Sequence, residues 1–121
     1  GGGAVKELNP QEFSAKVHEP GVVTLDIRTP DEFADAHIPG AINISLDNKP
    51  FTHTFANEIS NTFKNKVSKL DRSKGYAVYC HFGRRSDLAV LYMKKVGFKH
   101  LFHLQNGIVN WIGQGLPVTT T

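Results

Sequence analysis

Short apolar runs alternate along the chain with amphipathic segments. Residues 22–27 and 76–79 are rich in β-branched, aromatic and other apolar side chains, which is typical of buried strands, and residues 41–44 and 100–104 are two further runs of this kind. Because residues 22–27 are apolar at almost every position, we expect the strands to form a parallel sheet that is covered on both faces.

Capping signals predict helices between these runs. Asn9 and Thr29 each stand before a proline and three residues ahead of a glutamate, which is the pattern of a capped helix N-terminus. We expect one helix to run from Asn9 to about Val17 and another to run from Thr29 through Ala36.

Further helices are expected in the second half of the chain. Between residues 55 and 70 apolar residues recur at spacings of four and three, which predicts one face of a helix that follows a loop at 47–54. The apolar residues of this face are Phe55, Ile59, Phe63, Val67 and Leu70. A helix from Asp87 is expected to end at Gly97, and a short helix is expected to follow Gly107.

The alternation of strands and helices predicts a three-layer α/β domain with a mostly parallel sheet. With 121 residues the chain is long enough to bury a core of its own. Residues 5–118 are expected to form this single domain, and residues 1–4 are interpreted as a remnant of cloning or of a removed leader.

Composition and charge argue against several classes of function. The formal net charge of +3 is small, and the lysines are scattered without interleaved aromatic residues, so we expect them on solvated helix faces rather than in a nucleic-acid interface. No apolar run approaches the roughly 20 residues of a membrane-spanning helix. No signal peptide is visible, and a soluble cytoplasmic protein and an exported one whose leader has been removed fit the sequence equally well.

Cys80 is the only cysteine of the chain and lies where a reactive cysteine would be placed. It follows the strand at 76–79, and ligands of parallel sheets bind at the carboxyl ends of the strands. A tight loop that leads into a helix N-terminus turns backbone N–H groups towards the sulfur, which favours a thiolate nucleophile. Because the 121 residues contain no second cysteine, an outside thiol or other acceptor must resolve any sulfur intermediate on Cys80.

The loop residues from His81 to Ser86 are candidates for the site. Gly83 is expected to take a positive φ, and Ser86 is expected to cap the following helix. Arg84 and Arg85 are expected to bring positive charge to the sulfur and to receive an anionic substrate.

His81 and Phe82 are expected to line the site in other ways. Neighbouring side chains in a loop diverge, and a thiolate that N–H groups already stabilise needs little help, so His81 is not the favoured general base. Phe82 is expected to be exposed, as an apolar rim for a thiol donor or a partner protein. Four earlier residues are expected to support the site structurally, through a charge network and a turn: Asp26, Arg28, Glu32 and His37.

Three stretches of the chain resemble the single-domain rhodaneses, a group of sulfurtransferases. Residues 80–86 are similar to the family's C-x-x-G-x-R-S active loop. Residues 25–43 are similar to the segment D-x-R-x-x-x-E-[FY]…H-I-x-G-A-x-[NH], and residues 106–118 to the C-terminal G-G-x-x-x-W…G-x-P-V. The three stretches keep the family's order, and the resemblance extends from about Leu8 to Val118.

The resemblance implies the rhodanese fold, a five-stranded parallel sheet between helices, and a mechanism of sulfur transfer. Cys80 would attack the outer sulfur of thiosulfate or of a persulfide donor, hold it as a persulfide among loop N–H groups, and pass it to cyanide or a cellular thiol. The implied partners are a small anionic donor and a thiol or cyanide acceptor, with a protein acceptor as a further option. No metal or organic cofactor is required.

Two departures from the family pattern change the expectations locally. Asn106 replaces the first glycine of a Gly-Gly pair, and asparagine tolerates the positive φ of such a turn better than other non-glycine residues. The stretch from Asp47 to Leu70 is longer than in the smallest members of the family, and we expect it to form an extra helix near the site.

Two other functions remain open. The first is a cysteine phosphatase or an arsenate reductase. The phosphatases that share the fold have five residues between cysteine and arginine, whereas four separate Cys80 from Arg85, which favours sulfur over phosphate. The second is a persulfide carrier or interaction module that serves a partner protein.

Overall fold

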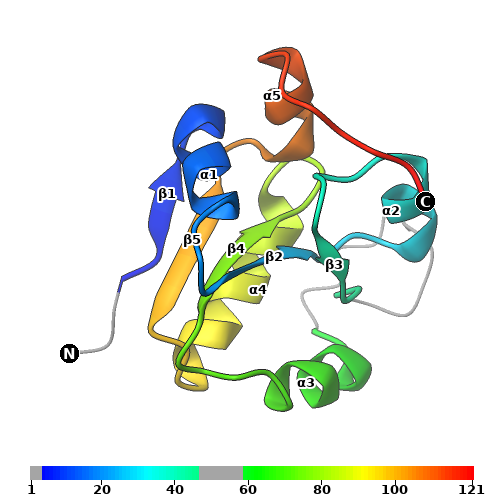
Figure 1. The fold of residues 1–121 in the computed structure, drawn as a ribbon. Helices are drawn as coiled ribbons and strands as arrows, with labels where there is room; N and C mark the ends of the chain where they lie inside the picture. Colours follow the sequence, from blue (N-terminus) through cyan, green and yellow to red (C-terminus); the bar gives the residue numbers. More distant parts are fainter. Residues whose placement is uncertain (1–3, 47–58) are drawn as a thin grey trace.

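The computed structural model describes residues 4–46 and 59–121, and in them five strands form one sheet in the order β1-β5-β4-β2-β3 (Figure 1). The strands are β1 (Lys6–Leu8), β2 (Val22–Asp26), β3 (Ile42–Asn43), β4 (Gly75–Tyr79) and β5 (His100–Leu104). Each neighbouring pair runs parallel. The predicted fold class, an α/β fold with a five-stranded parallel sheet, is confirmed.

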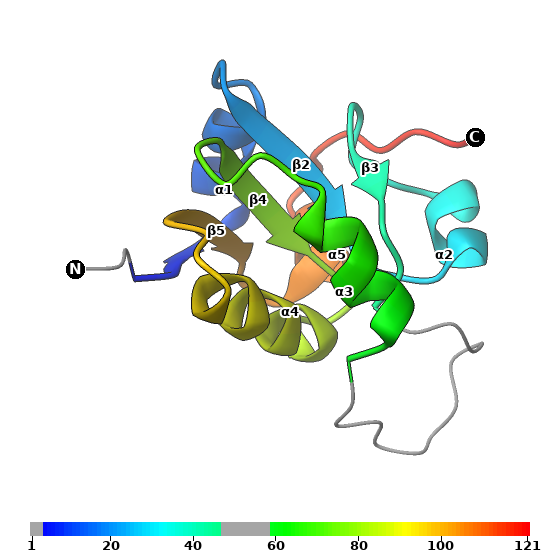
Figure 2. The same ribbon diagram turned by 90° about the horizontal axis from the view of Figure 1, so that it is seen from below.

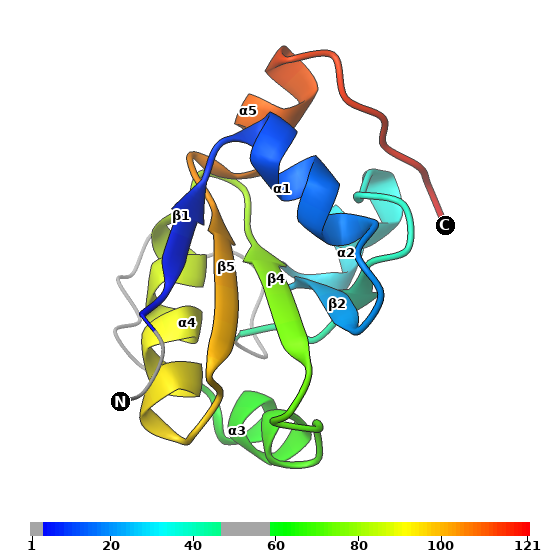
Figure 3. The same cartoon turned by 60° about the vertical axis from the view of Figure 1, so that its left-hand side comes forward.

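Helices cover both faces of this sheet and complete the three predicted layers. The helices of the described residues are α1 (Pro10–Val17), α2 (Pro30–Asp35), α3 (Asn61–Ser68), α4 (Arg84–Lys95) and α5 (Gly107–Gly113). α3 and α4 lie on one face, α1 and α5 pack on the other, and α2 lies beside the β3 edge (Figures 2 and 3). None of the helices in this part of the chain is long and apolar enough to cross a membrane.

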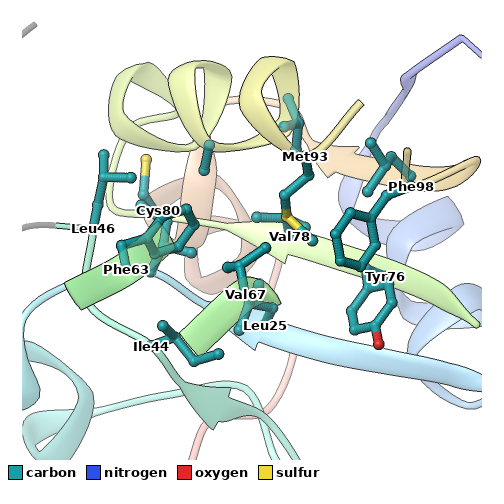
Figure 4. Close-up of a cluster of buried hydrophobic side chains, with 14 residues drawn as sticks. Leu25, Ile44, Leu46, Phe63, Val67, Tyr76, Val78, Cys80, Met93 and Phe98 are labelled. Atoms are coloured by element: carbon teal, nitrogen blue, oxygen red, sulfur yellow. The ribbon is translucent and has the colours of Figure 1, made fainter. Parts of the chain in front are cut away.

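The central strand β4 is buried along its whole length because both of its faces are covered. Side chains of a strand alternate between the two faces of the sheet. Tyr76, Val78 and Cys80 therefore enter the apolar cluster beneath α3 and α4 (Figure 4). Ala77 and Tyr79 enter the cluster beneath α1 and α5. Cys80, the residue directly after β4, is therefore packed at the edge of the apolar core.

The capping predictions for the first two helices are confirmed. The Asn9 side chain accepts the N–H of Glu12 at 2.8 Å, while the Glu12 carboxylate accepts the N–H of Asn9 at 3.0 Å. Thr29 and Glu32 make the same reciprocal pair at the start of α2. α2 ends at Asp35, one residue before the predicted end. The second capping pair fixes Glu32 in the first turn of α2, from which it reaches the site.

α3 does not include Ile59, so the prediction that the helix runs through Ile59 is wrong. Ser60 caps the helix, which begins at Asn61, so Ile59 precedes it. Phe63 is fully buried against the sheet, which confirms the predicted apolar face. The predicted loop and the predicted beginning of the helix fall in residues 47–58, outside the described residues.

β1 is a strand that the apolar pattern does not predict. Two of its three residues are exposed. It lies at the edge of the sheet and pairs with β5 alone, so its side chains lack the buried, apolar character of the central strands. In this pairing Glu7 lies opposite His103, which brings a carboxylate to the inner end of the site.

Candidate active site

Cys80 lies directly after β4, at the base of an open cavity of about 980 Å³. The side chain is only 1% exposed. The cavity is lined by Cys80 and the residues that follow it, by Glu32 from α2 and by residues of the α5 region. Cys80 and this cavity thus lie at the carboxyl end of a central parallel strand, where parallel sheets bind ligands.

Three donor groups surround the sulfur of Cys80. The backbone N–H of Gly83 donates to Sγ at 3.0 Å, the N–H of Ser86 donates at 3.3 Å, and the Ser86 hydroxyl lies 3.2 Å away. Gly83 has a φ of 106°, which confirms the predicted positive value and turns the chain directly into α4. The sulfur therefore lies against the positive end of a helix, where an anion is stabilised.

The predicted capping role of Ser86 is wrong. Gly83 is the N-cap residue and α4 begins at Arg84, so Ser86 lies inside the first turn of the helix and is fully buried. Its side chain faces the sulfur instead of closing the helix. The same early start places Arg84 and Arg85 in the first turn of α4 rather than in a loop.

The start of α5 holds the loop after Cys80 from behind. The N–H of Ile108 donates to the carbonyl of Cys80 at 2.9 Å. A Cβ on Gly107 would lie 2.1 Å from the carbonyl oxygen of His81, so only glycine permits this approach. Asn106 has a φ of 61°, which confirms that asparagine takes the left-handed turn expected at this position.

Arg85 and Glu32 form a bidentate ion pair at the edge of the cavity. The guanidinium donates to the two carboxylate oxygens at 2.7 Å and 2.9 Å. Burial raises the pKa of Glu32, but the hydrogen bonds and charge of Arg85, together with Thr29, outweigh this and lower the pKa to about 2. Burial lowers the pKa of Arg85, yet Glu32 and the nearby Cys80 raise it above its ordinary value. The ion pair therefore holds a permanently charged guanidinium in place near Cys80, with the Glu32 carboxylate as its counter-ion.

Asp26 and Arg28 form a separate pair beneath the site. Both are buried, and Arg28 Nη2 donates to Asp26 Oδ2 at 2.7 Å. Burial lowers the pKa of Arg28, but the hydrogen bond and charge of Asp26 raise it overall. The network expected to join Asp26, Arg28 and Glu32 is thus two pairs, because Glu32 turns from α2 towards α4. The ring of His37 bonds the Phe33 carbonyl at 2.8 Å, in the turn that follows α2.

The remaining loop residues line the mouth of the cavity. Phe82 is 63% exposed, and its ring meets the edge of the His81 ring. Burial lowers the pKa of His81, which favours the neutral imidazole. Arg84 is exposed and also lines the cavity. The side chains of His81, Phe82 and Arg84 can therefore contact a ligand that enters the cavity.

His103 contacts the site from behind, and the sequence analysis did not identify it. Its Nε2 lies 2.5 Å from the Ser86 hydroxyl, and its Nδ1 lies 2.6 Å from Glu7 and 3.4 Å from Asp87. His103 is buried in β5 beside β4, where it pairs with Val78. A polar residue at an inward position of an otherwise apolar strand was the signal that could have revealed it.

Glu7 is hydrogen-bonded to His103, and Asp87 lies 3.4 Å from the same ring nitrogen. Their ligand-type atoms lie within 4.8 Å of one another. The 2.6 Å between His103 Nδ1 and the Glu7 carboxylate is a hydrogen-bond length, shorter than the separation of two ligands that share a zinc ion about 2.0–2.1 Å from each.

Comparison with known proteins agrees with this geometry. The Rhodanese-like domain family matches residues 9–114. The chain is 27% identical over 115 residues to a protein of Allochromatium vinosum named Sulfurtransferase, and the match covers 94% of each chain. A crystal structure of a rhodanese-related protein from Thermoplasma volcanium matches with a TM-score of 0.76 at 27% identity, covering 96% of this chain and 99% of that one.

Other relatives are longer than this chain. YrkF of Bacillus subtilis, whose name gives it a provisional role as a sulfur carrier, is 29% identical over 92% of this chain and 53% of its own length. A tRNA uridine(34) hydroxylase of Legionella pneumophila is 30% identical over 87% of this chain and 38% of its own length. The chain thus spans about half or less of these two proteins.

Two of these relatives are named for handling sulfur. The family match covers most of the chain, from the start of α1 to the end of α5. The chain belongs to the rhodanese-like domain family.

Proposed function

We propose that the protein is a sulfurtransferase that carries a sulfane sulfur on Cys80, with thiosulfate or a persulfide as the donor and a thiol or cyanide as the acceptor. The observation that carries this proposal is the convergence of two backbone N–H groups and the Ser86 hydroxyl on one sulfur atom at the base of an open cavity. Such donors stabilise a negatively charged sulfur both before and after it is loaded.

The reaction takes place in two displacements. The Cys80 thiolate attacks the outer sulfur of thiosulfate, the S–S bond of the donor breaks, and sulfite leaves with the bonding electron pair. The enzyme is left with a persulfide anion on Cys80. Cyanide or a thiolate then attacks the outer sulfur, and the Cys80 thiolate is released. Two such steps joined by a covalent intermediate predict ping-pong kinetics.

The two arginines take different parts in this scheme. Arg85 is held by Glu32 and supplies a fixed positive charge near Cys80. Arg84 is exposed at the cavity and is therefore the residue that contacts an incoming anionic donor. The site uses one arginine for electrostatic stabilisation and the other for donor binding.

A role as a persulfide carrier for a partner protein is the second candidate. The observation that favours it is Phe82, a large apolar side chain that is 63% exposed at the cavity mouth. An apolar rim is better suited to contact with a protein acceptor than to contact with a small anion. A carrier would load sulfur normally but release it slowly to cyanide and free thiols.

Mass spectrometry after incubation with thiosulfate tests the proposal. We expect the wild-type protein to gain one sulfur atom on Cys80 and to lose it on addition of cyanide. The Cys80→Ser variant should gain none while keeping its circular dichroism spectrum. A wild-type protein that gains no sulfur from thiosulfate or from glutathione persulfide, but hydrolyses p-nitrophenyl phosphate, would show that the phosphatase alternative is correct.

A further inference from the structure

A continuous line of polar groups runs from the reactive sulfur through the core to the far edge of the sheet. Cys80 Sγ lies 3.2 Å from the Ser86 hydroxyl, which lies 2.5 Å from His103 Nε2, and His103 Nδ1 lies 2.6 Å from Glu7. His103 and Ser86 are both buried, at 2% and 0% exposure. Buried polar side chains are in most cases hydrogen-bonded, and both of these have partners within the line.

The carboxylate of Glu7 determines how the protons are placed along this line. A carboxylate can only accept, so His103 donates from Nδ1 to Glu7. In a neutral imidazole the other ring nitrogen then carries a lone pair, so Nε2 accepts the proton of the Ser86 hydroxyl. The Ser86 oxygen lies 3.2 Å from Sγ, so it can accept the S–H of a neutral Cys80 thiol, whereas its hydroxyl donates to Sγ when Cys80 is a thiolate.

We propose that His103 is a positioning residue that receives the proton of the Cys80 thiol through the Ser86 hydroxyl. The S–H bond breaks as the Ser86 oxygen takes the proton, and the hydroxyl proton passes to His103 Nε2. The thiol and neutral imidazole become a thiolate and an imidazolium, so the overall charge is unchanged. The Ser86 hydroxyl then donates to the thiolate and adds to the N–H groups of Gly83 and Ser86.

The charges that face His103 suit the imidazolium form. Glu7 faces the ring from β1 and Asp87 faces it from α4, at 2.6 Å and 3.4 Å from Nδ1. Both carboxylates therefore lie within ion-pair distance of the ring nitrogen that donates to Glu7. The Ser86 hydroxyl faces the other nitrogen, and through it the ring acts on Cys80.

His81 is the other histidine near the sulfur, but it does not have this connection. Its ring makes an edge contact with Phe82 and, among the described residues, no hydrogen bond to Cys80. Burial also lowers the pKa of His81; the charge of Glu32 opposes this, and nearby Arg28 and Arg85 add to it. Proton transfer from Cys80 therefore runs to the sheet side of the site and leaves the cavity side free for substrate.

The rate of alkylation by iodoacetamide, measured against pH in buffer with EDTA, tests this inference. The inference rests on the proposed function only where it concerns catalysis. The measurement itself does not, because alkylation by iodoacetamide requires a thiolate and no sulfur donor. The variant His103→Gln keeps a group that can bond Ser86 but cannot take up a proton. We expect its rate at pH 7 to fall about tenfold, and its half-maximal rate to move up by about one pH unit.

Two comparisons show whether the effect belongs to proton transfer. The limiting rate at high pH should equal that of the wild type, because all of the protein is then thiolate and access to the cavity is unchanged. His100→Gln, the same substitution at an exposed position of the same strand, should leave the profile unchanged. A His103→Gln profile that coincides with the wild-type profile would overturn the inference.

Glu7→Gln provides a second variant that leaves the core untouched, because Glu7 is exposed. Removing its charge should move the profile in the same direction by a smaller amount. If His103→Gln fails to fold and Glu7→Gln has the wild-type profile, the inference is wrong. A wild-type protein with the expected profiles that gains no sulfur from thiosulfate would refute the proposed function and leave the proton path supported.

Discussion

The Glu32–Arg85 ion pair should make the stability of the fold depend on pH in acid. The perturbation is Glu32→Gln, which keeps the carbonyl that accepts the Thr29 N–H and removes the negative charge. The pKa of Glu32 is about 2 in the folded protein, against an ordinary value of 4.5. A lowered pKa stabilises the fold above pH 4.5, and this stabilisation is lost as the pH falls towards 2.

The size of the effect follows from this difference in pKa. At about 1.4 kcal/mol for each of about 2.5 pH units, the ionised carboxylate adds at most about 3.5 kcal/mol to the free energy of unfolding at pH 7. By pH 3 about 1–1.5 kcal/mol of this is left, since the carboxylate of the unfolded chain is then almost fully protonated while that of the folded protein is still mostly ionised. The side chains are 21% and 27% exposed, so solvent reduces both values, and we expect about 1–3 kcal/mol at pH 7.

Urea unfolding of the wild type and of Glu32→Gln at pH 7 and pH 3 measures this difference. The gap between the two proteins should shrink by more than half on acidification. The control is Glu19→Gln, which breaks the exposed Lys16–Glu19 pair and should change the free energy of unfolding by less than about 1 kcal/mol. A gap between wild type and Glu32→Gln that is the same at both pH values would refute the role assigned to the ion pair.

Two further substitutions have matched controls within the chain. Gly107→Ala should lower the free energy of unfolding by about 2–4 kcal/mol in urea, because its Cβ would lie 2.1 Å from the His81 carbonyl oxygen. The control is Gly113→Ala in the same helix, where an added Cβ would meet no atom within 4 Å, so this change should be neutral or stabilising. Equal losses of unfolding free energy in the two variants would contradict this account. Arg84→Gln should raise the KM for thiosulfate about fivefold in initial-rate assays, since a partly exposed anion contact is worth about 1 kcal/mol. The control is Arg72→Gln, which should leave the KM unchanged because the Arg72 side chain lies over Phe98. Equal KM values in the two variants would contradict the donor-binding role of Arg84.

The sequence predicts the layers of the fold because its buried strands and capped helices are strong local signals. The runs at 22–27 and 76–79 are apolar on both faces and become the central strands β2 and β4. The capping patterns at Asn9 and Thr29 depend on neighbouring residues alone, and both appear as predicted. The sequence did not predict β1, because an edge strand with exposed side chains has no apolar pattern of its own.

The candidate site was predictable where it depends on the chain near Cys80 and not where it depends on distant pairing. Gly83 was assigned its positive φ correctly because a tight turn requires it. The role of Ser86 was misjudged, since only the three-dimensional structure shows that α4 begins at Arg84 and turns the Ser86 hydroxyl inward. The link from Ser86 to His103 joins residues far apart in sequence, and no spacing rule encodes it.

The close approach of Gly107 to the His81 carbonyl bears on attempts to transplant this chemistry into another protein. The seven residues 80–86 contain the sulfur and its donors, but the backbone that bends them is held by α5 through the N–H of Ile108 and through the space that Gly107 leaves. A graft of these seven residues alone would carry the reactive groups without the support that shapes them. The smallest portable unit therefore joins two segments that lie more than twenty residues apart in the chain.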